Sequence, residues 1–271
     1  MAYPMTDLNS DLFFDTTNYA HRTLFNPAPA WQTLAGLKNY MDNQQTPEAL
    51  PSGLATGTPL AETIVLANGI LLSGEGLTID FGDATKGKLM VFNPDGTHLK
   101  NATVLMAGVV MVGDNIRLGK GVLIESGVFI KGPLTVGDHS EIRQGAYLRG
   151  YCLIGERCVV GHTTEVKHSI FLDDAKAGHF AYIGDSILGN QVNLGAGTKL
   201  ANFRFLPGNV RIKTDAGHLD SGLRKMGALL GDGVQTGCNS VTSPGTLMAK
   251  KAMVMPNVTV PSGYHAKSII R

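Results

Sequence analysis

The sequence has little net charge and few aromatic residues. Its 23 Lys and Arg against 22 Asp and Glu leave a formal net charge of +1, and charged residues are 17% of the chain. Such a balance gives no field that would attract nucleic acid or an anionic membrane, so we expect neither as a partner. Aromatic residues are only 7% of the chain, which favours a core of small and branched side chains.

Cysteine and long apolar stretches are also scarce. The 3 cysteines are Cys152, Cys158 and Cys238, and an odd number cannot all pair. The N-terminus lacks a basic stretch followed by an apolar one. The longest apolar stretch, residues 102–112, is shorter than the roughly 20 residues that span a bilayer. We therefore expect a soluble protein in the reducing environment of the cytoplasm.

Glycine is abundant, with 34 residues, and an aliphatic residue recurs at every sixth position over a long stretch. A helix of 3.6 residues per turn cannot give a period of six, whereas short strands joined by glycine-permitted corners can. The sequence therefore predicts a β-solenoid. The recurring residues, which we expect to point inward, are Val112, Leu118, Ile124, Ile130, Val136, Ile142, Leu148, Ile154, Val160, Val166 and Leu172.

This pattern resembles the hexapeptide-repeat family of left-handed parallel β-helices, in which three hexads form one coil of eighteen residues. The resemblance implies an all-β fold with that handedness. A looser form of the rhythm returns at residues 227–261, and residues 203–225 between the two blocks predict a loop ejected from the coil. We expect residues 1–55 to form a small, partly helical N-terminal cap or docking segment with a linker. We expect residues 56–271 to form the β-helix, with irregular first coils up to residue 105.

Stepping by eighteen residues predicts which side chains share an outer face. Lys131, Arg149 and Lys167 fall in one column at about 5 Å spacing. Because like charges repel at that distance, we interpret the column as an anion site; a solvated basic ridge is the alternative. The same step places Arg143 and His179 in a neighbouring column with Gly161, at a point where the six-residue register slips.

The segment TEVKHSIFLDDAKAGHFAYIGDSILGNQVNLGAGTKLAN resembles more specifically the acetyltransferase half of the bifunctional enzymes that make UDP-N-acetylglucosamine. The resemblance covers roughly residues 100–262. In that family the histidine of the HxxYxGD motif is the general base, which implies this catalytic role for His179. Arg149 and Lys167 match the residues that hold the sugar phosphate, with Arg143 as the rival for the arginine. The remaining matches are Tyr182 and Asn193 for the sugar, and Ala196, Asn202 and Cys238 for the acetyl group and coenzyme A.

Two departures from the family pattern matter for function. The family continues after the asparagine with Tyr-Asp-Gly, whereas Asn202 is followed by Phe203, Arg204 and a long loop containing Arg211 and Lys213, which we expect to reach a neighbouring chain or the coenzyme phosphates. The acceptor sugar can therefore differ. In addition, no glycine-rich nucleotide loop opens a strand–helix unit, so we expect no uridyltransferase activity from this chain.

The resemblance thus implies transfer of an acetyl group from acetyl-CoA, as co-substrate, to the amine of a hexosamine 1-phosphate. The resemblance implies a homotrimer with sites between solenoids and no metal. A zinc enzyme of the γ-carbonic anhydrase type is disfavoured, because His162 and His168 do not follow its ligand pattern. The alternative is a non-catalytic solenoid that binds a sugar phosphate or sugar nucleotide, or serves as a scaffold.

Overall fold

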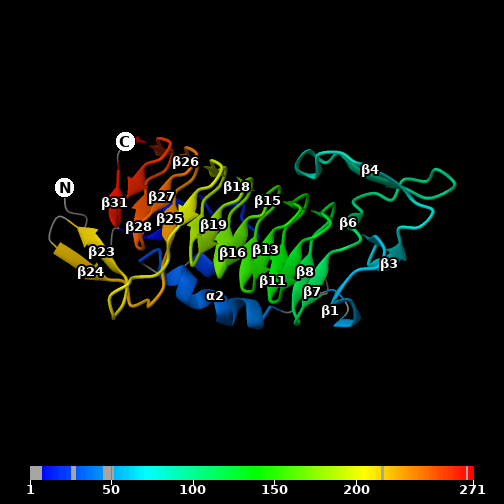
Figure 1. Cartoon of the computed structure of the whole chain (residues 1–271), viewed down its shortest axis with the longest axis horizontal. Helices are drawn as coiled ribbons and strands as arrows, with labels where there is room; N and C mark the ends of the chain where they lie inside the picture. The colour runs from blue at the N-terminus through cyan, green and yellow to red at the C-terminus, as the bar shows by residue number, and fades with distance from the viewer. Residues whose placement is uncertain (1–7, 26–28, 45–49, 51, 215–216, 267) are drawn as a thin grey trace.

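The computed structural model describes residues 8–25, 29–44, 50, 52–214, 217–266 and 268–271. Short parallel strands stack coil upon coil into an elongated solenoid, with α2 along one side (Figure 1). This confirms the predicted parallel β-helix. No helix in the described part of the chain is long and apolar enough to cross a membrane.

Three sheets form the faces of the solenoid. The nine-stranded sheet contains, in order, β1 (Thr56–Pro59), β7 (Val110–Val112), β10 (Phe129–Lys131), β13 (Tyr147–Arg149), β16 (Glu165–Lys167), β19 (Tyr182–Gly184), β22 (Lys199–Leu200), β27 (Val241–Thr242) and β30 (Thr259–Val260). The eight-stranded sheet contains β8 (Ile116–Leu118), β11 (Leu134–Val136), β14 (Cys152–Ile154), β17 (Ser169–Phe171), β20 (Ile187–Leu188), β25 (Ala228–Leu230), β28 (Thr246–Met248) and β31 (Gly263–His265). The eleven-stranded sheet contains β3 (Ile70–Ser73), β2 (Ile64–Ala67), β6 (Thr103–Leu105), β9 (Leu123–Ile124), β12 (Glu141–Ile142), β15 (Val159–His162), β18 (Lys176–His179), β21 (Asn193–Leu194), β26 (Gln235–Thr236), β29 (Met253–Val254) and β32 (Ile269–Ile270).

The predicted inward positions form the core from Leu118 to Val166, where every sixth residue is buried in one apolar cluster. The two ends of the series differ from the prediction. Met111 rather than Val112 is in register with Ile130. Phe171 rather than Leu172 is in register with Ile154, because that coil is one residue shorter than eighteen.

The shortened coils continue through the region of His179. Val160 is in register with Ala177, and His162 with His179. The prediction that His179 shares a column with Gly161 and Arg143 is therefore wrong by one residue. Because the coil here has seventeen residues, the residue beside His179 on the preceding coil is another histidine, His162.

The described part of the N-terminal segment lies against the outer face of the eight-stranded sheet rather than over an end of the solenoid. It contains α1 (Ser10–Phe13), the 3₁₀ helix η2 (Arg22–Phe25) and α2 (Gln32–Asp42). Its buried Phe13, Trp31 and Leu34 belong to one apolar cluster with outward-facing residues of the sheet. Those sheet residues are Leu153, Ile170, Ile187, Leu229 and Leu247, and burying them stabilises the docked segment.

After β22 the chain leaves the solenoid, and its described residues 203–214 and 217–225 include a hairpin of β23 (Arg211–Thr214) and β24 (Gly217–Asp220). The loop is anchored to the N-terminal segment, since the indole Nε1 of Trp31 donates to the carbonyl of Ser221 at 3.1 Å. Val210 and Ile212 of the loop are buried in the same cluster as Trp31.

The region before residue 105 forms antiparallel hairpins in place of the irregular coils expected there. β2 pairs with β3, and β4 (Thr78–Phe81) with β5 (Leu89–Phe92); the short 3₁₀ helices η3 (Ser52–Leu54) and η4 (Ala84–Lys86) complete this region. The β4 hairpin projects beyond the body of the solenoid (Figure 1). One hydrogen bond links the hairpin region to the solenoid: the backbone N–H of Ala84 donates to the side chain of Glu141 at 2.8 Å.

Candidate functional site

The predicted cationic column exists on the nine-stranded sheet. Lys131 of β10 is in register with Arg149 of β13. The pairing of Leu148 with Val166 places Lys167 of β16 next in the same column. The three cations therefore share one outer face of the solenoid, as the period of the sequence predicts.

Carboxylates of the chain itself lie beside two of these cations. Arg149 Nη1 donates to Glu165 at 2.6 Å, and Lys167 Nζ to Asp185 at 2.9 Å. The hydrogen bond that Arg149 donates to Glu165 raises the pKa of Arg149. The repulsion that led us to expect an external anion is thus already reduced by Glu165 and Asp185, which the sequence analysis did not single out.

Asp185 is the centre of a hydrogen-bonded cluster. Its side chain is only 7% exposed and accepts from Lys167, from His168 Nδ1 at 3.0 Å, and from the amide of Asn202. Burial raises the pKa of Asp185, but the hydrogen bonds from His168 and Lys167 outweigh it, and the pKa lies below its ordinary value. The carboxylate is therefore ionised at neutral pH.

Tyr182 connects to the same cluster through Asn202. Its hydroxyl donates to Asn202 Oδ1 at 3.3 Å. Burial raises the pKa of Tyr182, so the hydroxyl keeps its proton as a donor. Of the predicted site residues, the structure thus brings Arg149, Lys167, Tyr182 and Asn202 to one side of the nine-stranded sheet.

His179 lies at a different corner of the solenoid, at the end of β18. Its ring is exposed and stacks on the ring of His162, with centroids 5.7 Å apart. Ala196 follows in the next coil, because Ala177 is in register with Leu194. Cys238 comes next, since Leu194 is in register with Thr236. His179, Ala196 and Cys238 therefore form one column along this corner.

Strand β19 separates the two groups of residues. His179 precedes β19 at the corner shared by the eleven- and nine-stranded sheets, and Asp185 follows β19 at the corner shared by the nine- and eight-stranded sheets. Within the described residues, no hydrogen bond or ion pair joins His179 to Arg149 or Lys167. One chain therefore presents the imidazole and the cations at opposite edges of the same sheet.

Asn193 and the loop cations lie apart from both groups, whereas Arg143 lies at the same corner as His179, in the neighbouring column. Arg143 follows β12 and pairs with Glu141 at 2.7 Å, on the eleven-stranded sheet. Asn193 begins β21 and is exposed on that same sheet, beside Lys176. Arg211 and Lys213 belong to the β23–β24 hairpin, where they pair with Asp220 and His218 in the backbone register.

Phe203, which follows Asn202 where the family has a tyrosine, is in contact with two cationic side chains. Arg224 lies over the ring of Phe203, with its Cζ 4.5 Å from the centroid, and Lys225 lies at 5.9 Å. Phe205, two residues further on, is fully exposed. The loop that departs from the family pattern thus carries an exposed aromatic and cationic surface next to Asn202.

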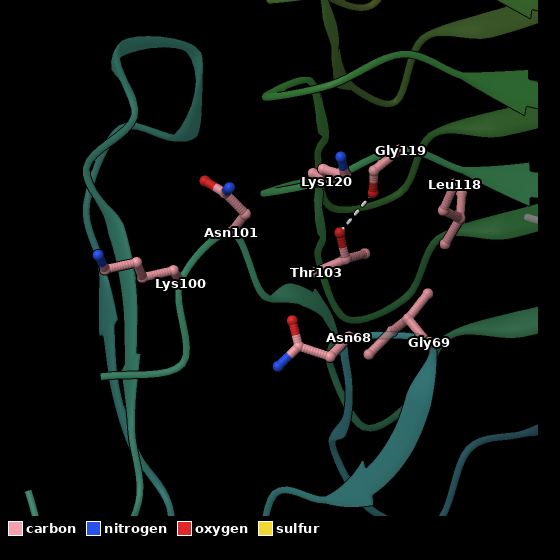
Figure 2. Close-up of a pocket in the computed structure, with 9 residues that line it drawn as sticks. Asn68, Gly69, Lys100, Asn101, Thr103, Leu118, Gly119 and Lys120 are labelled. Carbon is pink, nitrogen blue, oxygen red and sulfur yellow. Dashed lines mark hydrogen bonds between the residues drawn. The ribbon is translucent and has the colours of Figure 1, made fainter. Parts of the chain in front are cut away.

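Two of the cavities in the described part of the chain lie elsewhere on the solenoid. One of about 420 Å³ opens between the β2–β3 turn, residues 100–103 and the corner after β8, with Asn68, Asn101 and Lys120 in its lining (Figure 2). Another of about 430 Å³ lies between the N-terminal segment and the coil corners, next to His21 and Gln44. Neither includes His179. Across the described residues, no three His, Cys, Asp or Glu side chains gather as a metal site would require.

The family described as the GMPPB C-terminal domain matches residues 130–270, which is more than half of the chain. The chain belongs to this family. The match contains both the His179 corner and the Asp185 cluster, and it excludes the N-terminal segment and the first hairpins.

Curated relatives extend this assignment. A bifunctional sugar-1-phosphate nucleotidylyltransferase/acetyltransferase of Sulfurisphaera tokodaii is 37% identical over 155 residues, which are 51% of this chain and 39% of the relative. A bifunctional protein GlmU of a Synechococcus strain is 34% identical over 68% of this chain and 39% of the relative. Another, of a Nostoc strain, is 31% identical over 77% of this chain and 43% of the relative. The chain thus spans about two fifths of the length of these relatives, and with the stacked coils they confirm the resemblance to hexapeptide-repeat, left-handed β-helix acetyltransferases.

Proposed function

We propose that this protein transfers an acetyl group from acetyl-CoA to the amine of a hexosamine 1-phosphate, with His179 as general base. One observation carries the proposal. His179 presents an exposed imidazole at a corner of the solenoid, followed in the same column by the small side chains of Ala196 and Cys238. Similarity to relatives whose names include an acetyltransferase supports the reaction class.

The chemistry follows from what an exposed imidazole can do near neutral pH. The free amine attacks the thioester carbonyl carbon, and His179 would take the proton that the amine nitrogen loses as the C–N bond forms and a tetrahedral intermediate results. The C–S bond then breaks, and the departing thiolate receives that proton. The products are the N-acetylhexosamine 1-phosphate and coenzyme A, with no net change in protons on the enzyme.

The remaining residues would bind and orient the two substrates. Arg149 and Lys167 would hold the sugar phosphate through charge-assisted hydrogen bonds, and Tyr182 would bind the sugar. Asn193, on the eleven-stranded sheet, would reach the sugar only from a neighbouring copy. Asn202 would polarise the thioester carbonyl, and the column formed by Ala196 and Cys238 would leave room for the pantetheine chain. Orientation of the amine against the thioester would supply much of the acceleration.

The separation of the two corners favours a site shared between chains. Because one chain presents His179 and the cations at opposite edges of the nine-stranded sheet, a neighbouring copy would bring its own edge against them. We therefore propose that the protein is a homotrimer. As we also expect from the sequence, we propose that it acts in the cytoplasm, needs no metal, and has no uridyltransferase activity in this chain. Arg211 and Lys213, which belong to the β23–β24 hairpin, would act only if they reach a neighbouring copy. Arg143 lies at the corner that contains His179 and would have to release Glu141 to bind a substrate.

A specific observation favours a second candidate, a non-catalytic solenoid that binds a sugar phosphate or sugar nucleotide. One chain presents His179 and the cations at opposite edges of the nine-stranded sheet, so a phosphate held by Arg149 and Lys167 of one chain does not by itself place an amine beside the base. A continuous assay of free coenzyme A thiol separates the two functions. Glucosamine 1-phosphate, galactosamine 1-phosphate and amino-sugar nucleotides are offered in turn with acetyl-CoA; thiol release with one of them supports the transferase, and calorimetric binding without release supports the second candidate.

A further inference from the structure

Asp185 is placed to control the geometry of two site residues at once. It follows β19 at a corner of the solenoid, with φ 45°, a left-handed conformation that Asp tolerates better than most side chains. Its backbone N–H donates to the carbonyl of Lys167 at 3.0 Å, which fixes the corner on the preceding coil. The carboxylate therefore points at neighbours on the coils before and after it.

The hydrogen bonds of this carboxylate fill its accepting capacity. Oδ1 accepts from Lys167 Nζ at 3.1 Å and from His168 Nδ1 at 3.0 Å. Oδ2 accepts from Lys167 Nζ at 2.9 Å and from the amide of Asn202. An ionised carboxylate offers about four such positions. Asp185 is thus fully committed within the chain and has no capacity left to bind a substrate amine.

Each partner keeps part of its own capacity for a ligand. Among the hydrogen bonds of the described residues, Lys167 Nζ donates only to Asp185, so one of its three N–H groups is left for a phosphate oxygen. Asn202 donates one amide N–H to Asp185 while its Oδ1 accepts from Tyr182. These two contacts fix which way the carboxamide faces and leave its second N–H for another acceptor.

We propose that Asp185 is a positioning residue that holds the Lys167 ammonium and the Asn202 carboxamide in the orientation that receives the sugar phosphate and the acetyl donor. This inference rests on the proposed function and adds a residue that does not itself touch either substrate. Without Asp185, the flexible four-carbon chain of Lys167 would sample many rotamers, and the Asn202 amide would lose the contact that fixes its orientation.

The sign of the effect on phosphate binding distinguishes positioning from masking of charge. If Asp185 only neutralised Lys167, the variant Asp185→Asn would leave a stronger positive charge and bind hexosamine 1-phosphate more tightly. If Asp185 positions Lys167, the same variant binds more weakly, by about tenfold, which is the scale of one charge-assisted hydrogen bond.

The experiment measures the dissociation constant of glucosamine 1-phosphate by calorimetry, together with kcat and KM, for wild type, D185N, K167A and the double variant. D174N is the matched control, because Asp174 also has positive φ at a corner and pairs with Arg157 at 2.9 Å, away from both groups. We expect D185N and K167A each to weaken binding about tenfold, the double variant to bind no more weakly than K167A, and D174N to behave as wild type.

Two further results complete the test. Asp185→Glu keeps the charge and should recover part of the binding lost in D185N, which a variant that fails to fold would not show. Unchanged or tighter binding in D185N, or additive losses in the double variant, overturns the positioning role while leaving the proposed function intact. A wild-type protein that neither binds the sugar phosphate nor releases coenzyme A overturns the proposed function, and this inference with it.

Discussion

The rings of His162 and His179 stack between adjacent coils, with their planes inclined by 26°. The contact exists because the coil between them is one residue short, which brings the two residues into register. A Cβ on Gly161, the residue before His162, would collide with the backbone of Gly178, so the coils pack closely at this corner. His162 therefore supports the ring on which the proposed chemistry depends.

Replacing His162 tests that support. His162→Ala should lower kcat by about two- to tenfold with little change in KM for the sugar, since a ring contact is worth about 0.5–1.5 kcal/mol and the base itself remains. His162→Phe keeps a ring at this position and should retain most of the wild-type kcat. Steady-state kinetics of both variants check this, and a kcat for His162→Ala equal to wild type would contradict it.

The three cysteines should differ sharply in reactivity. Burial raises the pKa of the Cys152 thiol to about 12 and also raises that of Cys158, whereas Cys238 is exposed in the column that contains His179. Since the thiolate is the reactive form, a chromogenic disulfide reagent at pH 8 should titrate one thiol per native chain and three after unfolding. Cys238→Ser should abolish the native signal, and saturating acetyl-CoA should slow it. Rapid reaction of a second thiol in the native protein would be inconsistent with the core described here.

His21 makes the docked N-terminal segment sensitive to pH. Burial lowers its pKa from 6.5 to about 4, so the unfolded chain takes up the proton at a higher pH than the folded chain. The stability contributed by neutral His21 is complete above about pH 6.5 and is lost as the pH falls from 6.5 towards 4, by up to ~3 kcal/mol. Urea unfolding at pH 7 and pH 5 should show this loss in wild type and a smaller one in His21→Gln. Equal losses in the two proteins would assign the pH dependence to other groups.

The regular part of the fold could be predicted from the sequence because its period is unbroken. From Leu118 to Val166, the buried position recurs every sixth residue, and the column of Lys131, Arg149 and Lys167 follows from that period. The prediction fails where the period changes. Phe171 and Leu172 are both large and apolar, so the six-residue step cannot tell which one faces inward, and the error moves His179 by one position.

The carboxylate partners and the docked segment depend on contacts that the period does not specify. Asp185 lies eighteen residues after Lys167, so the same column could have indicated it, but the pairing arises because the shortened coil places Gly184 beside Lys167 and turns Asp185 back towards it. The outward Leu153 and Ile170 likewise signal a covered face, although nothing in the sequence assigns the N-terminal segment to it.

The most direct test of the proposed function compares coenzyme A release by wild type and His179→Ala, each supplied with acetyl-CoA and glucosamine 1-phosphate or whichever amino sugar the acceptor panel identifies. Light scattering on both proteins confirms that the assembly is unchanged. We predict turnover by wild type and its loss in His179→Ala, with binding of the sugar phosphate retained. Equal turnover by the two proteins would contradict the assignment of His179 as the general base.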